Sequence, residues 1–84
     1  MSYRLEIKPF AAKEMRKLPS TMLKRVNARI KSLVENQYAS GAKKLAGSPR
    51  FRISVGAYRV IYRIDADSLL VLILAVRHRR EAYR

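Results

Sequence analysis

The sequence predicts a small α+β domain in which a helical hairpin packs on a mainly antiparallel, twisted sheet of four strands, in the order β-α-α-β-β-β. Three observations support this. A segment of period-two alternation opens the chain, two segments of helical spacing follow, and strand-like segments separated by short turns fill the second half. We expect one domain, 1–84, because the chain has neither an internal repeat nor a linker.

The first strand is predicted at the N-terminus. Tyr3, Leu5 and Ile7 alternate with charged residues, so one face of this strand is expected to be buried. Pro9 ends the strand and suits the first turn of a helix, where its missing N–H is no loss.

Two helices are predicted next. Residues 10–18 carry Phe10 and Met15 on one apolar face, and a proline stops this helix. Ser20 is a plausible N-cap for a second helix that runs to about Asn36 with apolar residues at helical spacing. The short connection between them predicts a helical hairpin.

A loop and three strands complete the fold. Residues 36–49 contain glycines and serines and predict a loop. Strands are predicted at 50–55, 58–65 and 69–76. The last of these is continuously apolar, which is typical of a central strand covered on both faces.

The hairpin between the first two of these strands has a predictable register. If Gly56 and Ala57 form the turn, each later pair is fixed, because side chains alternate between the two faces. On the face predicted to pack on the helices, the pairs are Val55 with Tyr58, Ile53 with Val60, and Phe51 with Tyr62. On the other face they are Ser54 with Arg59, Arg52 with Ile61, and Arg50 with Arg63. This second face is cationic, and Arg52 lies diagonal to Arg59.

The charge indicates an acidic partner. The formal net charge is +13, and from Ser48 onward every basic residue except His78 is an arginine. Arginine grips phosphate with a planar fork and stacks on bases, so this concentration favours nucleic acid, with an acidic protein as the second candidate. An anionic membrane fits less well, since the basic stretches do not lie opposite a broad apolar face. There is no cysteine, and no apolar run has signal-peptide or membrane-spanning length, so we expect a cytoplasmic protein.

Several motifs resemble the RelE/ParE superfamily of type II toxins, on the RelE side. They are the helix motif A-x-K-x-x-x-K-L from Ala11, the loop motif K-K-L-x-G from Lys43, the hairpin R-I-x-V-G-x-Y-R-V-I-Y-x-I from Arg52, and the tail V-x-H-R-R-E-x-Y-R from Val76. Each is weak alone, but their order and spacing are specific and cover nearly the whole chain.

The resemblance implies a RelE-like microbial RNase fold and a ribosome-dependent mRNA endoribonuclease, an mRNA interferase that cuts messenger RNA in the A site. The implied reaction is attack by the RNA 2′-hydroxyl on the adjacent phosphate. It needs a base for the 2′-hydroxyl, cations on the phosphorane and an acid for the 5′-oxygen. No metal and no cofactor are implied.

The resemblance also implies a catalytic set. Arg59 would hold the phosphate, Arg79 would assist the leaving group, and Tyr83 would stack on a base. Arg52 and Ser54 occupy positions that are lysine in the best-known members. An arginine does not release its proton and a serine has no charge, so a general base is missing from these positions.

His78 is the obvious substitute for the base, because an imidazole ordinarily titrates near neutral pH. The competing interpretation is a rim residue paired with Glu81. For Tyr83, an aromatic packed on the sheet edge is the alternative. Further RNA contacts are expected from the other basic residues of the second half and of the loop: Arg50, Arg63, Arg77, Arg80, Lys43 and Lys44.

Two other functions stay open at this point. One is a ParE-like inhibitor of DNA gyrase, and the other is a catalytically weakened toxin that still binds its antitoxin. Under every interpretation the resemblance implies a cognate RelB-like antitoxin, whose acidic amphipathic segment would wrap the toxin. Complexes of two toxins and two antitoxins are common in the family. For the interferase, the ribosome and A-site mRNA are the further partners.

Overall fold

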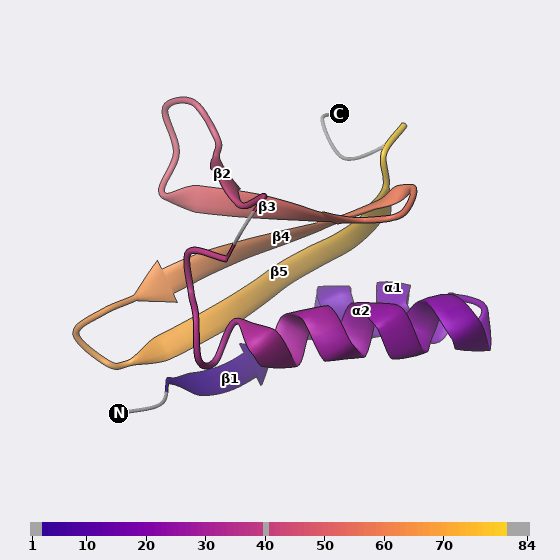
Figure 1. The fold of residues 1–84 in the computed structure, drawn as a ribbon, viewed down its shortest axis with the longest axis horizontal. Helices are drawn as coiled ribbons and strands as arrows, with labels where there is room; N and C mark the ends of the chain where they lie inside the picture. The colour runs from indigo at the N-terminus through magenta and orange to yellow at the C-terminus, as the bar shows by residue number, and fades with distance from the viewer. Residues whose placement is uncertain (1–2, 40, 81–84) are drawn as a thin grey trace.

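The computed structural model describes residues 3–39 and 41–80. Two helices lie on one side of a single sheet, and β1 and β2 form its two edges (Figure 1). The elements, in chain order, are β1 (Arg4–Ile7), α1 (Pro9–Arg16), α2 (Ser20–Ser32), β2 (Lys43–Lys44), β3 (Arg50–Val55), β4 (Tyr58–Asp65) and β5 (Leu70–His78). No helix in this described part of the chain is long and apolar enough to cross a membrane.

The sheet has five strands in the order β1-β5-β4-β3-β2. β1 runs parallel to β5, and all the other neighbours are antiparallel. The α+β class and the helical hairpin are therefore confirmed, but the prediction of four strands is wrong. The additional strand, β2, lies in the predicted loop, where Lys43 pairs with Arg52 and Lys44 with Phe51. Two residues are too few to show alternation, so the sequence carries no pattern for this strand.

The β3–β4 hairpin has the predicted register at every pair from Val55 with Tyr58 to Arg50 with Arg63. Gly56 supplies the turn with a φ of +58°, a left-handed conformation that side chains disfavour. A Cβ at this position would lie 3.2 Å from Met22 Cε, so the turn also packs closely on α2.

The predicted ends of the helices differ from the observed ones. α1 begins at Pro9 and stops at Arg16, two residues before the predicted end. Ser20 is the first helical residue of α2 and is not its cap, because Pro19 occupies the cap position without a side-chain hydrogen bond. α2 stops at Ser32 instead of about Asn36. The Gln37 side chain donates to the carbonyls of Leu33 and Val34, at 3.0 and 2.8 Å, and so satisfies acceptors that a longer helix would have used.

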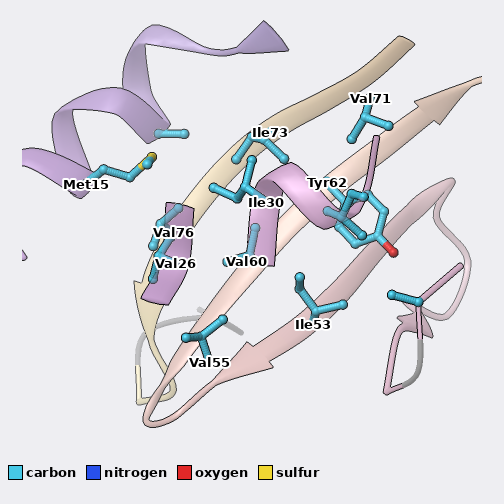
Figure 2. Packing of buried hydrophobic residues seen from close by; sticks show 13 residues of the cluster. Met15, Val26, Ile30, Ile53, Val55, Val60, Tyr62, Val71, Ile73 and Val76 are labelled. Carbon is cyan, nitrogen blue, oxygen red and sulfur yellow. The ribbon is translucent and has the colours of Figure 1, made fainter. Parts of the chain in front are cut away.

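The core lies between the helices and one face of the sheet. Figure 2 shows Val26 and Ile30 of α2 and Met15 of α1 against the inward side chains of the sheet, among them Tyr62. Tyr62 is fully buried, and its hydroxyl donates to the Gln37 carbonyl oxygen at 2.8 Å. This contact ties the segment after α2 to β4.

β5 is not covered on both faces by described residues, contrary to the prediction from its apolar run. Val71, Ile73 and Val76 are buried beneath the helices, whereas Leu72 and Leu74 are partly exposed on the opposite side. The strand also contains a bulge, since Ile61 pairs with Ala75 while Tyr62 pairs with Ile73. Leu74 is the extra residue. The sheet therefore presents an apolar area on the side away from the helices.

Candidate functional site

The sheet face that points away from the helices, here called the open face, carries the predicted cations in three cross-strand rows. Residues directly opposite one another on paired strands share a face, so the register defines these rows. They are Ser54–Arg59–Arg77, Lys43–Arg52–Ile61–Ala75 and Arg50–Arg63–Leu72. The structure thus brings Lys43, Arg50, Arg52, Arg59 and Arg63 onto one surface. Lys44, in contrast, pairs with Phe51 and belongs to the helix-facing side, so the two lysines of the loop do not act together.

Arg59 is half-buried at the turn end of the open face. Its NH1 group donates to the carbonyl oxygens of Gly56 and Tyr58, at 3.2 and 3.0 Å. Within residues 3–39 and 41–80, its buried Nε has no hydrogen-bond acceptor. The NH1 contacts therefore anchor the Arg59 side chain to its own turn. A buried donor without a partner costs free energy, which Nε recovers only if the turn shifts enough to admit an acceptor.

Arg52 and Arg59 form the predicted diagonal pair. Arg52 faces Ile61, which lies two residues beyond Arg59 on β4, so the two arginines are roughly 7–8 Å apart at their backbones. Arg52 is partly buried, and Ser54, directly opposite Arg59, is exposed. Two guanidinium groups at this spacing suit one phosphate group, and neither Arg52 nor Ser54 supplies a proton acceptor.

The residues after β5 return to the same turn. The backbone N–H of Arg79 donates to the Ala57 carbonyl oxygen at 2.7 Å, which extends the β4–β5 ladder by one bond. Arg79 is exposed and sits next to the turn that holds Arg59. Arg80 is exposed as well. Tyr83, the remaining member of the predicted catalytic set, lies outside the described residues.

Arg77 is opposite Arg59 in the register, but its guanidinium group binds α1. Its Nε donates to Glu14 Oε2 at 3.2 Å, and its Cζ lies over the Phe10 ring, 5.1 Å from the centroid. The other oxygen of Glu14 accepts the Val76 backbone N–H at 2.9 Å. β1 ends at Ile7, so the edge of β5 beyond Ile73 has no strand beside it, and the Glu14 carboxylate takes the place of one.

His78 lies on the helix-facing side of the sheet, away from Arg52 and Arg59. It pairs with Tyr58, and the two rings meet edge to face with centroids 5.5 Å apart. Its Nδ1 accepts the Arg80 backbone N–H at 3.3 Å. The structure therefore does not bring the predicted substitute base together with the arginines it was expected to serve.

Sequence reasoning missed two residues at this site. Phe10 was assigned to the buried face of its helix, but its side chain is 50% exposed and reaches Arg77. Glu14 lies outside the apolar pattern of residues 10–18, yet its side chain is only 19% exposed. A signal for Glu14 does exist, because it is the only acidic residue in a helix that otherwise carries the basic residues Lys13 and Arg16. For Phe10 the helical pattern gave no such signal.

The chain matches the family of the ParE toxin of the type II toxin-antitoxin system parDE over residues 5–83. It is 30% identical to the mRNA interferase toxin RelE of Escherichia coli over 88 aligned positions, which cover 99% of this chain and 92% of that protein.

Two solved structures of toxin–antitoxin complexes are also similar to this fold. The RelE–RelB complex of Pyrococcus horikoshii superposes with a TM-score of 0.85 at 26% identity, covering 98% of this chain and all of that one (100%). The RelBE complex of Mycobacterium tuberculosis gives a TM-score of 0.83 at 28% identity, covering 93% of this chain and 99% of that one. These likenesses extend over both the helical hairpin and the sheet that carries the arginines. The chain therefore belongs to the RelE/ParE family of type II toxin–antitoxin toxins, as a RelE-type toxin.

Proposed function

We propose that this toxin is a ribosome-dependent mRNA endoribonuclease that cuts messenger RNA in the A site and thereby inhibits translation. One observation carries the proposal: Arg52, Arg59 and the backbone of Arg79 converge at the turn end of the open face. An enzyme that transfers a phosphoryl group without a metal depends on cations placed where charge develops. The similarity to an mRNA interferase supports the same activity.

The proposed reaction forms a bond between the 2′-oxygen and phosphorus and breaks the bond from phosphorus to the 5′-oxygen. The products are a 2′,3′-cyclic phosphate and a 5′-hydroxyl. Arg59 and Arg52 stabilise the phosphorane, and Arg79 stands by the departing 5′-oxygen. Tyr83 is proposed to stack on a base of the substrate. Arg50, Arg63 and Lys43 attract the RNA backbone along the open face, and Arg80 does so beside the turn.

The proton transfers are assigned to the ribosome. Neither Arg52 nor Ser54 accepts a proton under physiological conditions, and His78 faces the helices. Among the described residues, the acids of the open face, Glu6 and Asp65, lie at the end away from Arg59. An enzyme without a general base among its described residues, acting only where ribosomal RNA supplies one, would be silent on free RNA. This activity takes place where translation does, so the protein is proposed to be cytoplasmic.

A RelB-like antitoxin is proposed as the cognate partner. The similar structures from P. horikoshii and M. tuberculosis are complexes of a toxin with its antitoxin. A charge of +13 suits an acidic, wrapping segment as well as RNA. A heterotetramer of two toxins and two antitoxins is the proposed assembly, and its mass in solution tests it.

Expression in cells tests the activity. Primer extension on a translated message is expected to map cuts inside A-site codons for the wild type, and none for Arg59→Ala. Arg16→Ala is the matched control, because it removes the same charge from an exposed position on α1. Growth arrest with intact messages, or equal cleavage by Arg59→Ala, would show that the proposed site is wrong.

A ParE-like gyrase inhibitor is the second candidate, and the match to the ParE family favours it. A supercoiling assay separates the two functions, because a gyrase poison accumulates cleaved DNA complexes and leaves mRNA intact. The third candidate, a weakened toxin, follows from arginine and serine at positions 52 and 54. A weakened toxin is expected to bind its antitoxin, and its cleavage of mRNA is expected to be faster after the substitution Ser54→Lys.

A further inference from the structure

A pocket of about 310 Å³ lies on the open face, one row away from Arg59. It is lined by residues from α1, the loop before β3, and β3, β4 and β5. Ile61 and Ala75 belong to its floor and to the row that contains Arg52. The pocket thus lies next to the proposed reaction centre and is not part of it.

The floor of the pocket is apolar because of the bulge in β5. Leu74 is the extra residue of that bulge, so Leu74 and Ala75 both line the pocket beside Ile61. Without the bulge, strict alternation from Ile73 would leave Leu74 on the open face and send Ala75 to the helix side. Leu45, from the loop before β3, adds a further apolar wall.

The wall at the α1 end is aromatic and cationic. The Phe10 ring is half-exposed, and the Arg77 guanidinium group lies over it. Glu14 neutralises Arg77 and fixes its position. Because the charge of Arg77 is paired with Glu14, its guanidinium group is better suited to stacking, through a flat and weakly hydrated surface, than to binding a phosphate through its charge.

The opposite end of the pocket carries Arg50, an exposed arginine next to Arg63 on the open face. The pocket therefore combines an apolar floor, a stacking wall and a cationic rim. An apolar side chain of a protein partner would use the floor but would have little use for the rim. A nucleotide uses all three, because it has a π-face and an adjoining phosphate.

We infer that this pocket is a base-binding subsite for single-stranded RNA, in which a nucleobase stacks against Phe10 and Arg77 while Arg50 holds the adjoining phosphate. The inference rests on the proposed function, because the proposed function sets how the RNA chain runs along the open face. Ile61 and Arg59 are two residues apart on β4, about 7 Å along the strand. The base would therefore belong to a nucleotide next to the one that is cut. Its recognition would favour particular bases near the cleavage point.

Fluorescence anisotropy of the purified full chain tests the subsite. Two labelled probes are compared: a 2′-O-methyl hexaadenylate, which cannot undergo 2′-hydroxyl attack, and an abasic backbone of the same length and charge. Phe10→Ala is expected to weaken binding of the hexaadenylate about 5- to 150-fold, the usual loss for one base stacked on an aromatic ring. Binding of the abasic backbone is expected to be unchanged.

Three further variants give the result its meaning. Phe10→Tyr preserves the ring and is expected to bind both probes as the wild type does. Tyr38→Ala is the matched control, since Tyr38 is an aromatic residue that is 64% exposed and packs on Phe51, away from the open face. Arg50→Gln is expected to weaken both probes and to lower the salt dependence of binding by about one unit of slope. Thermal unfolding of each variant verifies that it is folded.

Equal losses for Phe10→Ala on the two probes, or a loss no larger than that of Tyr38→Ala, would overturn the inference. Failure of the wild type to discriminate between the probes would do so as well. If Phe10→Ala binds both RNA probes as the wild type does but no longer binds an acidic amphipathic peptide, the pocket would instead be assigned to a side chain of a protein partner. The A-site cleavage assay is separate. If Phe10→Ala weakens binding of the hexaadenylate only, but the wild type does not cleave mRNA, the subsite is retained and the nuclease function is rejected. If the wild type cleaves mRNA and Phe10→Ala binds both probes normally, the nuclease function is retained and the subsite is rejected.

Discussion

The contact of Glu14 with the edge of β5 allows a quantitative prediction. The carboxylate accepts the Val76 backbone N–H at 2.9 Å through Oε1 and the Arg77 Nε at 3.2 Å through Oε2. It thereby replaces a sheet neighbour for the part of β5 that leads to Arg79. Replacing Glu14 by alanine removes both acceptors, whereas glutamine keeps a carbonyl oxygen for the N–H and removes only the negative charge.

The two losses have different magnitudes. Val76 is 2% exposed, so its N–H has little access to water, and leaving it without an acceptor costs about 1–3 kcal/mol. The ion pair is partly exposed, with side chains 31% and 19% accessible, and contributes only about 0–1 kcal/mol after screening. Glu14→Ala is therefore expected to lower the free energy of unfolding by about 1–4 kcal/mol, and Glu14→Gln by about 0–1 kcal/mol.

Urea unfolding followed by circular dichroism measures both changes. In a domain of this size each kcal/mol corresponds to a shift of about 4–8 °C in Tm, so thermal unfolding provides a second readout. Amide hydrogen exchange at Val76 is expected to accelerate in Glu14→Ala and to remain slow in Glu14→Gln. Equal destabilisation by the two substitutions would refute the reasoning, because it would assign the whole effect to the charge.

Four further predictions concern the framework. Gly56→Ala places a side chain at a φ of +58°, and is expected to lower the free energy of unfolding by about 1–2 kcal/mol in urea. Tyr62→Phe removes the 2.8 Å bond to the Gln37 carbonyl and is expected to cost about 1 kcal/mol. Burial raises the pKa of Tyr62, so absorbance at alkaline pH is expected to show this tyrosine ionising above the ordinary tyrosine pKa. The stability that the neutral Tyr62 contributes to the fold is therefore fully present below the ordinary tyrosine pKa, and it is lost as pH rises through the raised pKa. The backbone N–H of Ser68 donates to the Asp65 carboxylate and lowers the pKa of Asp65. The stability that the ionised Asp65 contributes is present above the ordinary aspartate pKa and is lost as pH falls through the lowered pKa. An NMR titration of the native and Asp65→Asn chains would detect this.

Strict alternation made the cationic face predictable from the sequence. One glycine turn fixed the register of β3 and β4, so the diagonal of Arg52 and Arg59 followed from pattern alone. These features depend on local periodicity and on a single turn, which a sequence displays directly.

The remaining features depend on contacts between distant segments. Arg77 was expected to bind RNA, but its guanidinium group binds Glu14, 63 residues earlier in the chain. The interpretation of His78 as a substitute base required a position beside the arginines, and the alternation of β5 places it on the other face. The Leu74 bulge, which creates the apolar pocket, leaves no mark in a continuously apolar run. Patterns of spacing do not report which side chains meet across elements.

Cleavage in a reconstituted system tests the central claim most directly. Ribosomes programmed with a defined mRNA are mixed with the toxin, and the A-site nucleotide whose 2′-hydroxyl attacks is either ribose or 2′-deoxyribose. We predict a cut that leaves a 2′,3′-cyclic phosphate and a 5′-hydroxyl on the ribose message, no cut on the deoxy message, and loss of cleavage in Arg59→Ala but not in Arg16→Ala. Cleavage of the deoxy message, or full activity of Arg59→Ala, would contradict the account.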